Sequence, residues 1–234
     1  MVIPWSLENY EFCAVSSLSN RCGRLRSRVR PAMTKITTID ALEALYGTQP
    51  QASLDKAIPY LTAEYRAFIE ASPFMVMATV GEGGTDCSPR GDPAGFVRIE
   101  DERTLLIPDR RGNNRLDTLR NLVADPRCSL LFLVPGAGET IRVNGRADII
   151  SDSDLSEQFE MQGKRPATVL RVHIESVYFQ CGKALIRSQL WDSDIQIERK
   201  SLPSAGDMVK AIKADFDAAT YDADYPERMK KTIY

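Results

Sequence analysis

Apolar and polar positions along the chain repeat with two periods, which predict where helices and strands lie. Helical spacing of apolar residues runs from Ile39 to Tyr46, where Gly47 ends it, and recurs after Thr62, a suitable N-cap residue. Strand-like runs are short, and turn residues separate several of them. The predicted strands cover residues 74–80, 85–90, 103–107, 127–134, 141–150 and 169–179.

Further helices are predicted between and after these strands. One spans residues 114–123, with leucines on a common face and a stop at Asp125-Pro126, and a short one spans residues 154–161. Met208, Val209, Ile212 and Phe216 mark a C-terminal helix, and Pro226 is expected to break the tail that follows. Short strands joined by hairpins, with few helices between them, predict a mainly β domain with flanking helices (α+β), built as an antiparallel barrel or sandwich.

The first 33 residues differ from the rest of the chain. They carry five arginines between positions 21 and 30, no acid among those arginines, and no clear periodicity. A transit peptide is also Arg-rich, but Glu8 and Glu11 argue against it. We therefore expect residues 1–33 to be a disordered extension, or sequence upstream of a true start at Met33, and residues 34–234 to form one domain.

Composition narrows the functional classes. Of the 234 residues 43 % are hydrophobic, the net charge is −2, and no apolar run approaches the roughly 20 residues that span a bilayer, so no nucleic-acid or membrane partner is expected. Five cysteines without a CxxC pair favour free thiols in the cytoplasm over a zinc site or a disulfide framework. With His173 as the single histidine and no GxSxG sequence, a hydrolase is a weak hypothesis and no metal site is expected.

Three segments combine cations with residues that permit an exposed backbone: residues 87–93, 108–117 and 182–191. The second joins a strand to a helix, and the N–H groups of a helix N-terminus attract anions. Asn113 or Asn114 is a candidate cap there, and Arg111 and Arg115 supply guanidinium groups that suit phosphate oxygens. Taken alone, each segment is better explained as a solvated turn, and neither a Walker sequence nor GxGxxG occurs.

The order of these segments resembles the pyridoxamine 5'-phosphate oxidase superfamily of FMN-binding split β-barrels. Residues 74–79 followed by Ser88-Pro89-Arg90-Gly91-Asp92 look like its opening hairpin, and residues 108–115 look like its phosphate-binding turn. The sequence CGKALIRSQLW at residues 181–191 is similar to the closing segment of an uncharacterised branch. The resemblance covers roughly residues 36–234.

The resemblance implies an FMN cofactor, a small-molecule substrate, a homodimer and two sites at the dimer interface. By position, the residues that would bind the FMN phosphate are Arg111, Asn114 and Arg115, and Arg111 is expected to contribute no more to FMN affinity than Arg115. The residues that would lie along the ribityl chain and the isoalloxazine are Ser88 and Arg90. The residues that would border the site are Lys183, Arg187, Ser188 and Trp191. The sequence does not tell which of the two subunits supplies them.

One departure limits the function that the resemblance implies. The vitamin-forming oxidases hold the substrate phosphate with an Arg-x-His segment, whereas this chain reads Tyr-Pro-Glu-Arg-Met at residues 225–229. The first hypothesis is therefore an FMN-dependent oxidoreductase with another substrate; FMN and a deazaflavin are not distinguished. The alternatives are a flavin- or haem-binding sensor or storage module without turnover, for which His173 in a strand is a poor haem ligand, and a split barrel without a cofactor.

Overall fold

The computed structural model describes residues 35–234, and the chain divides into two units after Thr48. The described part of the first unit contains helix α1 (Ile39–Tyr46). The Thr38 hydroxyl caps this helix by accepting from the Ala41 N–H, and Gly47, with φ of 74°, ends it as predicted. The expectation that residues 1–33 form an extension lies outside the described residues.

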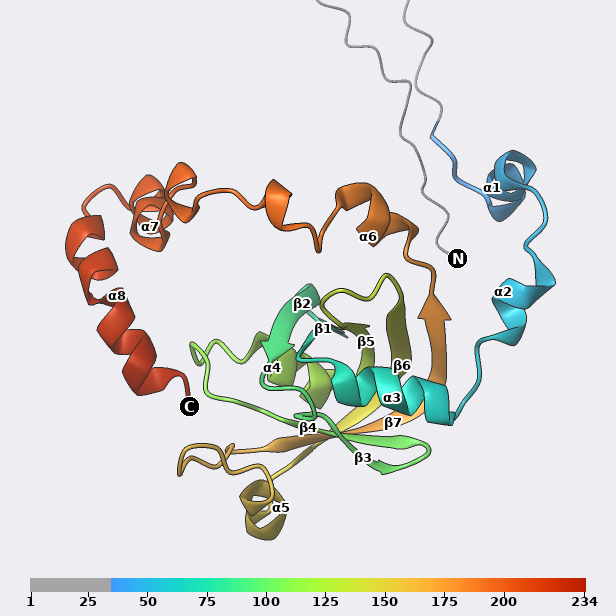
Figure 1. Cartoon of the computed structure of the whole chain (residues 1–234), viewed down its shortest axis with the longest axis horizontal. Helices are drawn as coiled ribbons and strands as arrows, with labels where there is room; N and C mark the ends of the chain where they lie inside the picture. The colour runs from blue at the N-terminus through green and yellow to red at the C-terminus, as the bar shows by residue number, and fades with distance from the viewer. Residues whose placement is uncertain (1–34) are drawn as a thin grey trace, which may run out of the picture. The chain divides into compact units, whose positions relative to one another are not determined.

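The second unit, Gln49–Tyr234, contains one antiparallel sheet of seven strands in the order β2-β1-β5-β6-β7-β4-β3. Figure 1 shows these strands curling around a shared interior. The antiparallel, mainly β architecture predicted from the sequence is thus confirmed. The strands are β1 (Phe74–Gly81), β2 (Gly84–Gly91), β3 (Arg98–Asp101), β4 (Thr104–Pro108), β5 (Arg127–Leu133), β6 (Thr140–Ile150) and β7 (Val169–Gln180).

Strand β3 was not predicted, because its four residues, Arg-Ile-Glu-Asp, are mostly polar and show no run. It forms through its neighbour: Arg98 pairs with Leu106 of the buried strand β4, so the partner supplies the apolar surface that β3 lacks. Tertiary pairing of this kind overrides a weak local signal.

The core consists of the inward-facing residues of the long strands. Met75 and Met77 of β1 are fully buried, as are alternate residues of β5, β6 and β7, so the period of two predicted for β6 and β7 is confirmed. The fully or almost fully buried strand residues are Met75, Met77, Leu105, Ile107, Leu130, Phe132, Ile141, Val143, Val169, Leu170, Val172 and Val177.

A bulge between Asn144 and Gly145 shifts the register of β6 against β7. A Cβ atom at Gly145 would lie 2.0 Å from the carbonyl oxygen of His173, so only glycine allows the two backbones to approach this closely. Bulges increase local twist, which helps a sheet curl.

Two helices cover the sheet where its apolar residues need shielding. Helix α3 (Ala63–Ala71) begins at Thr62, whose hydroxyl accepts from the Tyr65 N–H as predicted, and packs against β6. Helix α4 (Asp117–Ala124) packs against β1, β2 and β6 and buries Leu122. The short helices α2 (Gln51–Asp55) and α5 (Ser153–Glu157) complete this part of the unit, with α5 ending earlier than the predicted residue 161.

The chain after β7 is helical and buries almost no apolar side chain. Its helices are α6 (Lys183–Ser188), α7 (Ala205–Ile212) and α8 (Ala218–Thr232), with 3₁₀ turns at Ser193–Ile195 and Arg199–Ser201. Helix α7 ends before Phe216, which instead packs its ring against Tyr221.

The predicted break at Pro226 is wrong, because α8 runs through it. Proline has a φ that suits a helix, and here it removes one N–H bond from an exposed helix that the Asp217 side chain caps at its start. Within residues 35–234, no helix is both long and apolar enough to cross a membrane.

Candidate functional site

A pocket of about 970 Å³ opens where β2 and β4 end and α4 begins. A volume of this size lies at the upper end of the range for small-molecule and cofactor sites. The pocket combines the end of β2, the β4–α4 connection, the loop before β7 and the residues after α8. Its lining is Ser88 to Pro93, Phe96, Pro108 to Leu119, Lys164 to Thr168, Ile233 and Tyr234.

At one end of the pocket, hydroxyl groups from β2 and α4 converge on a carboxylate. Ser88 Oγ and Thr118 Oγ1 both donate to Asp86 Oδ2, over 2.8 and 2.7 Å. The bond from Thr118 is the main reason why the pKa of Asp86 lies below its ordinary value, so this carboxylate stays ionised at neutral pH. The network fixes Ser88 and ties the first turn of α4 to β2.

In the middle of the pocket lies a half-buried ion pair. Arg90 Nη1 donates to Asp109 Oδ1 over 2.7 Å, and both side chains are less than one fifth exposed. Arg90 Nε and Thr168 Oγ1 are buried and have no hydrogen-bond partner in the described chain. Buried polar atoms are normally satisfied, so these two atoms in the wall of one pocket indicate a place where a bound molecule completes the hydrogen bonding.

The connection from β4 to α4 has an unusual backbone. Asn114 and Leu116 both have φ near 60°, in the left-handed region, which is costly for a leucine. The expected cap at Asn113 or Asn114 is wrong: Leu116 occupies the N-cap position without a side-chain bond, and α4 begins at Asp117 rather than at residue 114. The left-handed residues stop the helix from extending further back, and Asn113 instead accepts from the Arg115 N–H.

This connection presents backbone donors beside two cations. In the described structure the N–H groups of Gly112, Asn113 and Asn114 donate to no other residue. Turns with left-handed residues direct such groups outward and bind anions. The local backbone and its exposed arginines thus give this end of the pocket N–H donors and positive charge that suit an anion.

The cations that line the pocket differ in whether an acid neutralises them. Arg115 is 73 % exposed and pairs with Asp117, while Arg165 pairs with Glu157 and Glu160. Among residues 35–234, no acidic side chain lies within ion-pair distance of Arg111 or Lys164. Arg111 and Lys164 are therefore the cations best placed to bind a ligand anion.

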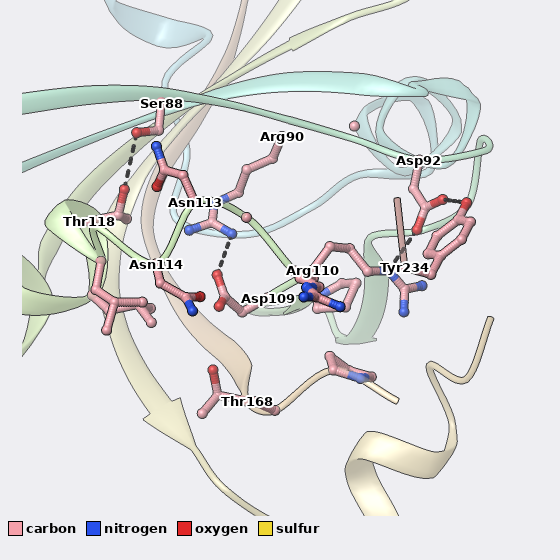
Figure 2. A pocket seen from close by; sticks show the side chains of 18 of the residues that line it. Ser88, Arg90, Asp92, Asp109, Arg110, Asn113, Asn114, Thr118, Thr168 and Tyr234 are labelled. Atoms are coloured by element: carbon pink, nitrogen blue, oxygen red, sulfur yellow. Dashed lines mark hydrogen bonds and ion pairs between the residues drawn. The ribbon is translucent and has the colours of Figure 1, made fainter. Parts of the chain in front are cut away.

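The other end of the pocket is formed by Asp92, Arg110 and Tyr234. Figure 2 shows Asp92 and Tyr234 at one side of the view and Ser88 and Thr118 at the other. The Asp92 carboxylate accepts from Arg110 Nε over 2.7 Å and from the Tyr234 hydroxyl over 2.6 Å. The bond to Asp92 is the main cause that raises the pKa of Tyr234, with burial and the charge of Asp92 adding to it, so this phenol is a neutral donor at neutral pH.

The structure brings together five of the nine residues predicted for cofactor binding, and places four elsewhere. The pocket is lined by Ser88, Arg90, Arg111, Asn114 and Arg115, and it is not lined by Lys183, Arg187, Ser188 or Trp191. The latter group begins where the backbone of Gly182 lies against Gly138, and Trp191 Nε1 donates to the Ala137 oxygen over 2.7 Å. Residues 183–191 are thus anchored at the turn between β5 and β6.

The single histidine and a buried cysteine lie outside the pocket. His173 is about half exposed, with Nε2 at 3.0 Å from Asp148 Oδ2. Cys128 is buried, and burial raises the pKa of its thiol to about 12. Across the described residues, no three His, Cys, Asp or Glu side chains gather in a way that suits a metal ion.

Sequence reasoning missed several pocket residues. Lys164 and Thr168 precede β7, where the Lys-Arg-Pro sequence at residues 164–166 gave a weak signal of an exposed basic turn. Asp92 and Arg110 lie within the predicted segments but were given no role, and Tyr234 had no signal, because their association depends on contacts between segments up to 142 positions apart.

Comparison with known families settles the family. The sequence model described as pyridoxamine 5'-phosphate oxidase matches residues 61–181, just over half of the chain. The chain belongs to the pyridoxamine 5'-phosphate oxidase family. The resemblance predicted from the sequence is thereby confirmed, together with the flavin-binding split-barrel fold of this family.

Solved structures similar to this chain carry several different names. A putative pyridoxamine 5'-phosphate oxidase from Lactobacillus delbrueckii is 19 % identical, covers 52 % of this chain and 95 % of its own, and gives a TM-score of 0.42. HupZ from Group A Streptococcus is 19 % identical over 50 % of this chain and 91 % of its own, with a TM-score of 0.42. An FAD-binding protein from Mesorhizobium loti is 18 % identical over 53 % and 94 %, with a TM-score of 0.38. No curated protein matches the chain.

Proposed function

We propose that this protein is an FMN-dependent oxidoreductase acting on a small molecule, and that it binds FMN in the pocket at the ends of β2 and β4. The observation that carries the proposal is the asymmetry of the pocket. Its α4 end has open backbone N–H groups and Arg111, a cation without an acidic partner in the described chain, whereas Arg110 at the Asp92 end is neutralised. A molecule with a dianionic phosphate at one end and a neutral, planar ring system at the other fits this distribution of charge.

The residues of the pocket leave hydrogen-bonding groups unpaired, and these groups suit the polar parts of FMN. Arg111 and the backbone at Asn114 would hold the phosphate, with Arg115 contributing once it leaves Asp117. The unpartnered Arg90 Nε and Thr168 Oγ1 would face the polar chain and the ring edge, and Ser88 would contact the same part of the cofactor. When bound, the flavin supplies the redox chemistry, and the protein orients it and excludes water.

Turnover distinguishes an enzyme from a storage or sensor protein. We expect the flavin of the purified protein to be reduced by NADPH or NADH without oxygen, and to be oxidised again when oxygen is admitted. The visible absorption band of oxidised flavin, followed in a stopped-flow spectrometer, measures both steps through its loss and its return. A flavin that dithionite reduces but neither nicotinamide reduces would instead favour the module without turnover.

A homodimer forms part of the same proposal. The chain from 183 onward exposes a long series of apolar side chains that this copy does not cover, and exposed apolar surface on this scale is typical of an interface. The residues expected to border the site lie in the same segment and do not line the pocket of their own chain. Both observations support a closed dimer in which residues 183–191 complete the pocket of the other copy. The exposed residues are Ile186, Leu190, Trp191, Ile195, Ile197, Leu202, Met208, Val209, Ile212, Tyr225, Met229 and Ile233.

Mixing two defective variants tests the shared site. We expect light scattering to give twice the mass of one chain, and we expect Arg111→Ala and Arg187→Ala each to lower FMN binding. When the two variants are unfolded together and refolded, half of the dimers are mixed, and each mixed dimer has one intact site, so about a quarter of the sites bind FMN normally. Recovery of no sites, or a monomer that binds FMN fully, would contradict the shared site.

A further inference from the structure

We propose that Tyr234 is a specificity-determining wall of the pocket, held by Asp92 and Arg110, and that it selects a flat, conjugated substrate that carries a carboxylate or carbonyl oxygen and no phosphate. This inference rests on the proposed function, because it concerns the substrate that meets the bound flavin.

The first observation is that Tyr234 is firmly held. Both carboxylate oxygens of Asp92 are engaged, Oδ2 by Arg110 and Oδ1 by the Tyr234 hydroxyl, and the Asp92 side chain is only 2 % exposed. Arg110 is held in turn, since its Nη1 donates to the Phe159 carbonyl over 2.6 Å. Its guanidinium lies 5.5 Å from the centre of the Tyr234 ring, within the range of a cation–π contact.

The second observation is where this cluster lies. Ile233 and Tyr234 are the only lining residues that come from the sequence after Thr168, among those that the structure describes. Figure 2 shows Tyr234 beside Asp92, away from the Ser88 and Thr118 side chains near the start of α4. The segment after α8 therefore crosses to the end of the pocket that does not bind the phosphate.

The third observation is what the cluster leaves open for a ligand. The hydroxyl of Tyr234 and both oxygens of Asp92 are occupied, so the aromatic ring remains as the contact surface. Arg110 has donors beyond the Nε and Nη1 bonds, because a guanidinium carries five N–H groups. An aromatic surface beside spare N–H donors recognises a planar molecule with an acceptor oxygen.

The Asp92–Arg110 ion pair does not favour a phosphate. Asp92 neutralises Arg110 at 2.7 Å, so this pair offers a dianion no net positive charge. The situation at the α4 end is the reverse, where Arg111 has no acidic partner in the described chain. A substrate phosphate is thus disfavoured where the substrate lies, in agreement with the missing Arg-x-His segment.

Two nitroaromatic probes test this inference on the flavin-loaded protein. We expect 4-nitrobenzoate to bind and to perturb the flavin spectrum, and 4-nitrophenyl phosphate to bind at least tenfold more weakly. Tyr234→Ala should weaken the binding of 4-nitrobenzoate by about tenfold, which corresponds to about 1.4 kcal/mol, because the variant loses the aromatic contact. Tyr234→Phe, which keeps the ring, should lose less than Tyr234→Ala, and FMN affinity should change less than twofold in both variants.

Tyr60→Ala is the matched control, since Tyr60 is exposed, lies outside the segment after residue 183 and does not line the pocket. Equal affinity of wild type and Tyr234→Ala for 4-nitrobenzoate would overturn the role of Tyr234, and equal affinity for the two probes would overturn the substrate class. If the protein binds no FMN, the proposed function fails separately. The same titration by calorimetry on the flavin-free protein then still decides whether Tyr234 contacts the probe.

Discussion

Arg111→Ala is expected to lower the affinity for FMN by roughly tenfold to a hundredfold and to leave the affinity for riboflavin unchanged. Arg111 lies in the pocket without an acidic partner in the described chain, so a phosphate dianion gains the full charge-assisted hydrogen bond. Such a bond contributes about 1.5–3 kcal/mol, and 1.4 kcal/mol corresponds to a factor of ten. Titration of the flavin-free protein, followed by flavin fluorescence, gives both dissociation constants.

Two further arginine variants make this result specific. Arg115→Ala should cost less than tenfold, because Arg115 is paired with Asp117 and must exchange that partner for the phosphate. The structure thus reverses the ranking that the sequence gave to these two arginines. Arg103→Ala, at an exposed position outside the pocket, should change neither affinity. A loss of riboflavin binding equal to the loss of FMN binding would show that Arg111 supports the fold rather than the phosphate.

Gly145→Ala is expected to destabilise the protein by at least about 3 kcal/mol, because the new Cβ would lie 2.0 Å from the His173 carbonyl oxygen. The atom that the new Cβ would meet belongs to the backbone of β7. The clash can therefore be relieved only by separating two central strands, and not by moving one side chain. Urea unfolding should show a lower midpoint at an unchanged slope.

Gly83→Ala is the control for this substitution. Gly83 lies in the turn between β1 and β2, and nothing lies within 4 Å of a Cβ added there. Its expected effect is within about 0.5 kcal/mol. If both alanine variants unfold at the same urea concentration as the wild type, the close contact between β6 and β7 at the bulge does not exist in solution.

The sequence predicted most of the sheet because its strands are half buried. Residues such as Met75 and Met77, or Ile141 and Val143, alternate with more exposed positions, and that period is visible without a structure. The prediction from sequence failed for β3, whose apolar surface comes from its partner β4. It also failed for Pro226, because the effect of a proline in a helix depends on what surrounds it. The prediction placed helix α4 correctly but gave it a start that is three residues too early, because no local pattern reveals that Leu116 adopts a left-handed conformation.

For the candidate site, sequence reasoning found the cations and missed their partners. Arg90 and Arg111 were identified from turn composition, and both line the pocket. Which arginine is neutralised depends on acids from other segments, such as Asp109 beside Arg90, and on contacts as distant in sequence as Asp92 with Tyr234. Charge pairing of this kind is set by the fold, so the structure was needed to separate arginines without an acidic partner in the described chain from those that are paired.

The most direct test of the account is the cofactor that the protein carries when purified. Denaturation followed by mass spectrometry and absorbance should identify FMN at close to one per chain in the wild type. The double variant Arg111→Ala, Arg115→Ala should carry almost none, while Arg103→Ala matches the wild type. A wild type that carries a deazaflavin, FAD or no flavin, or a double variant that retains FMN in full, would contradict the assignment of this pocket as an FMN site.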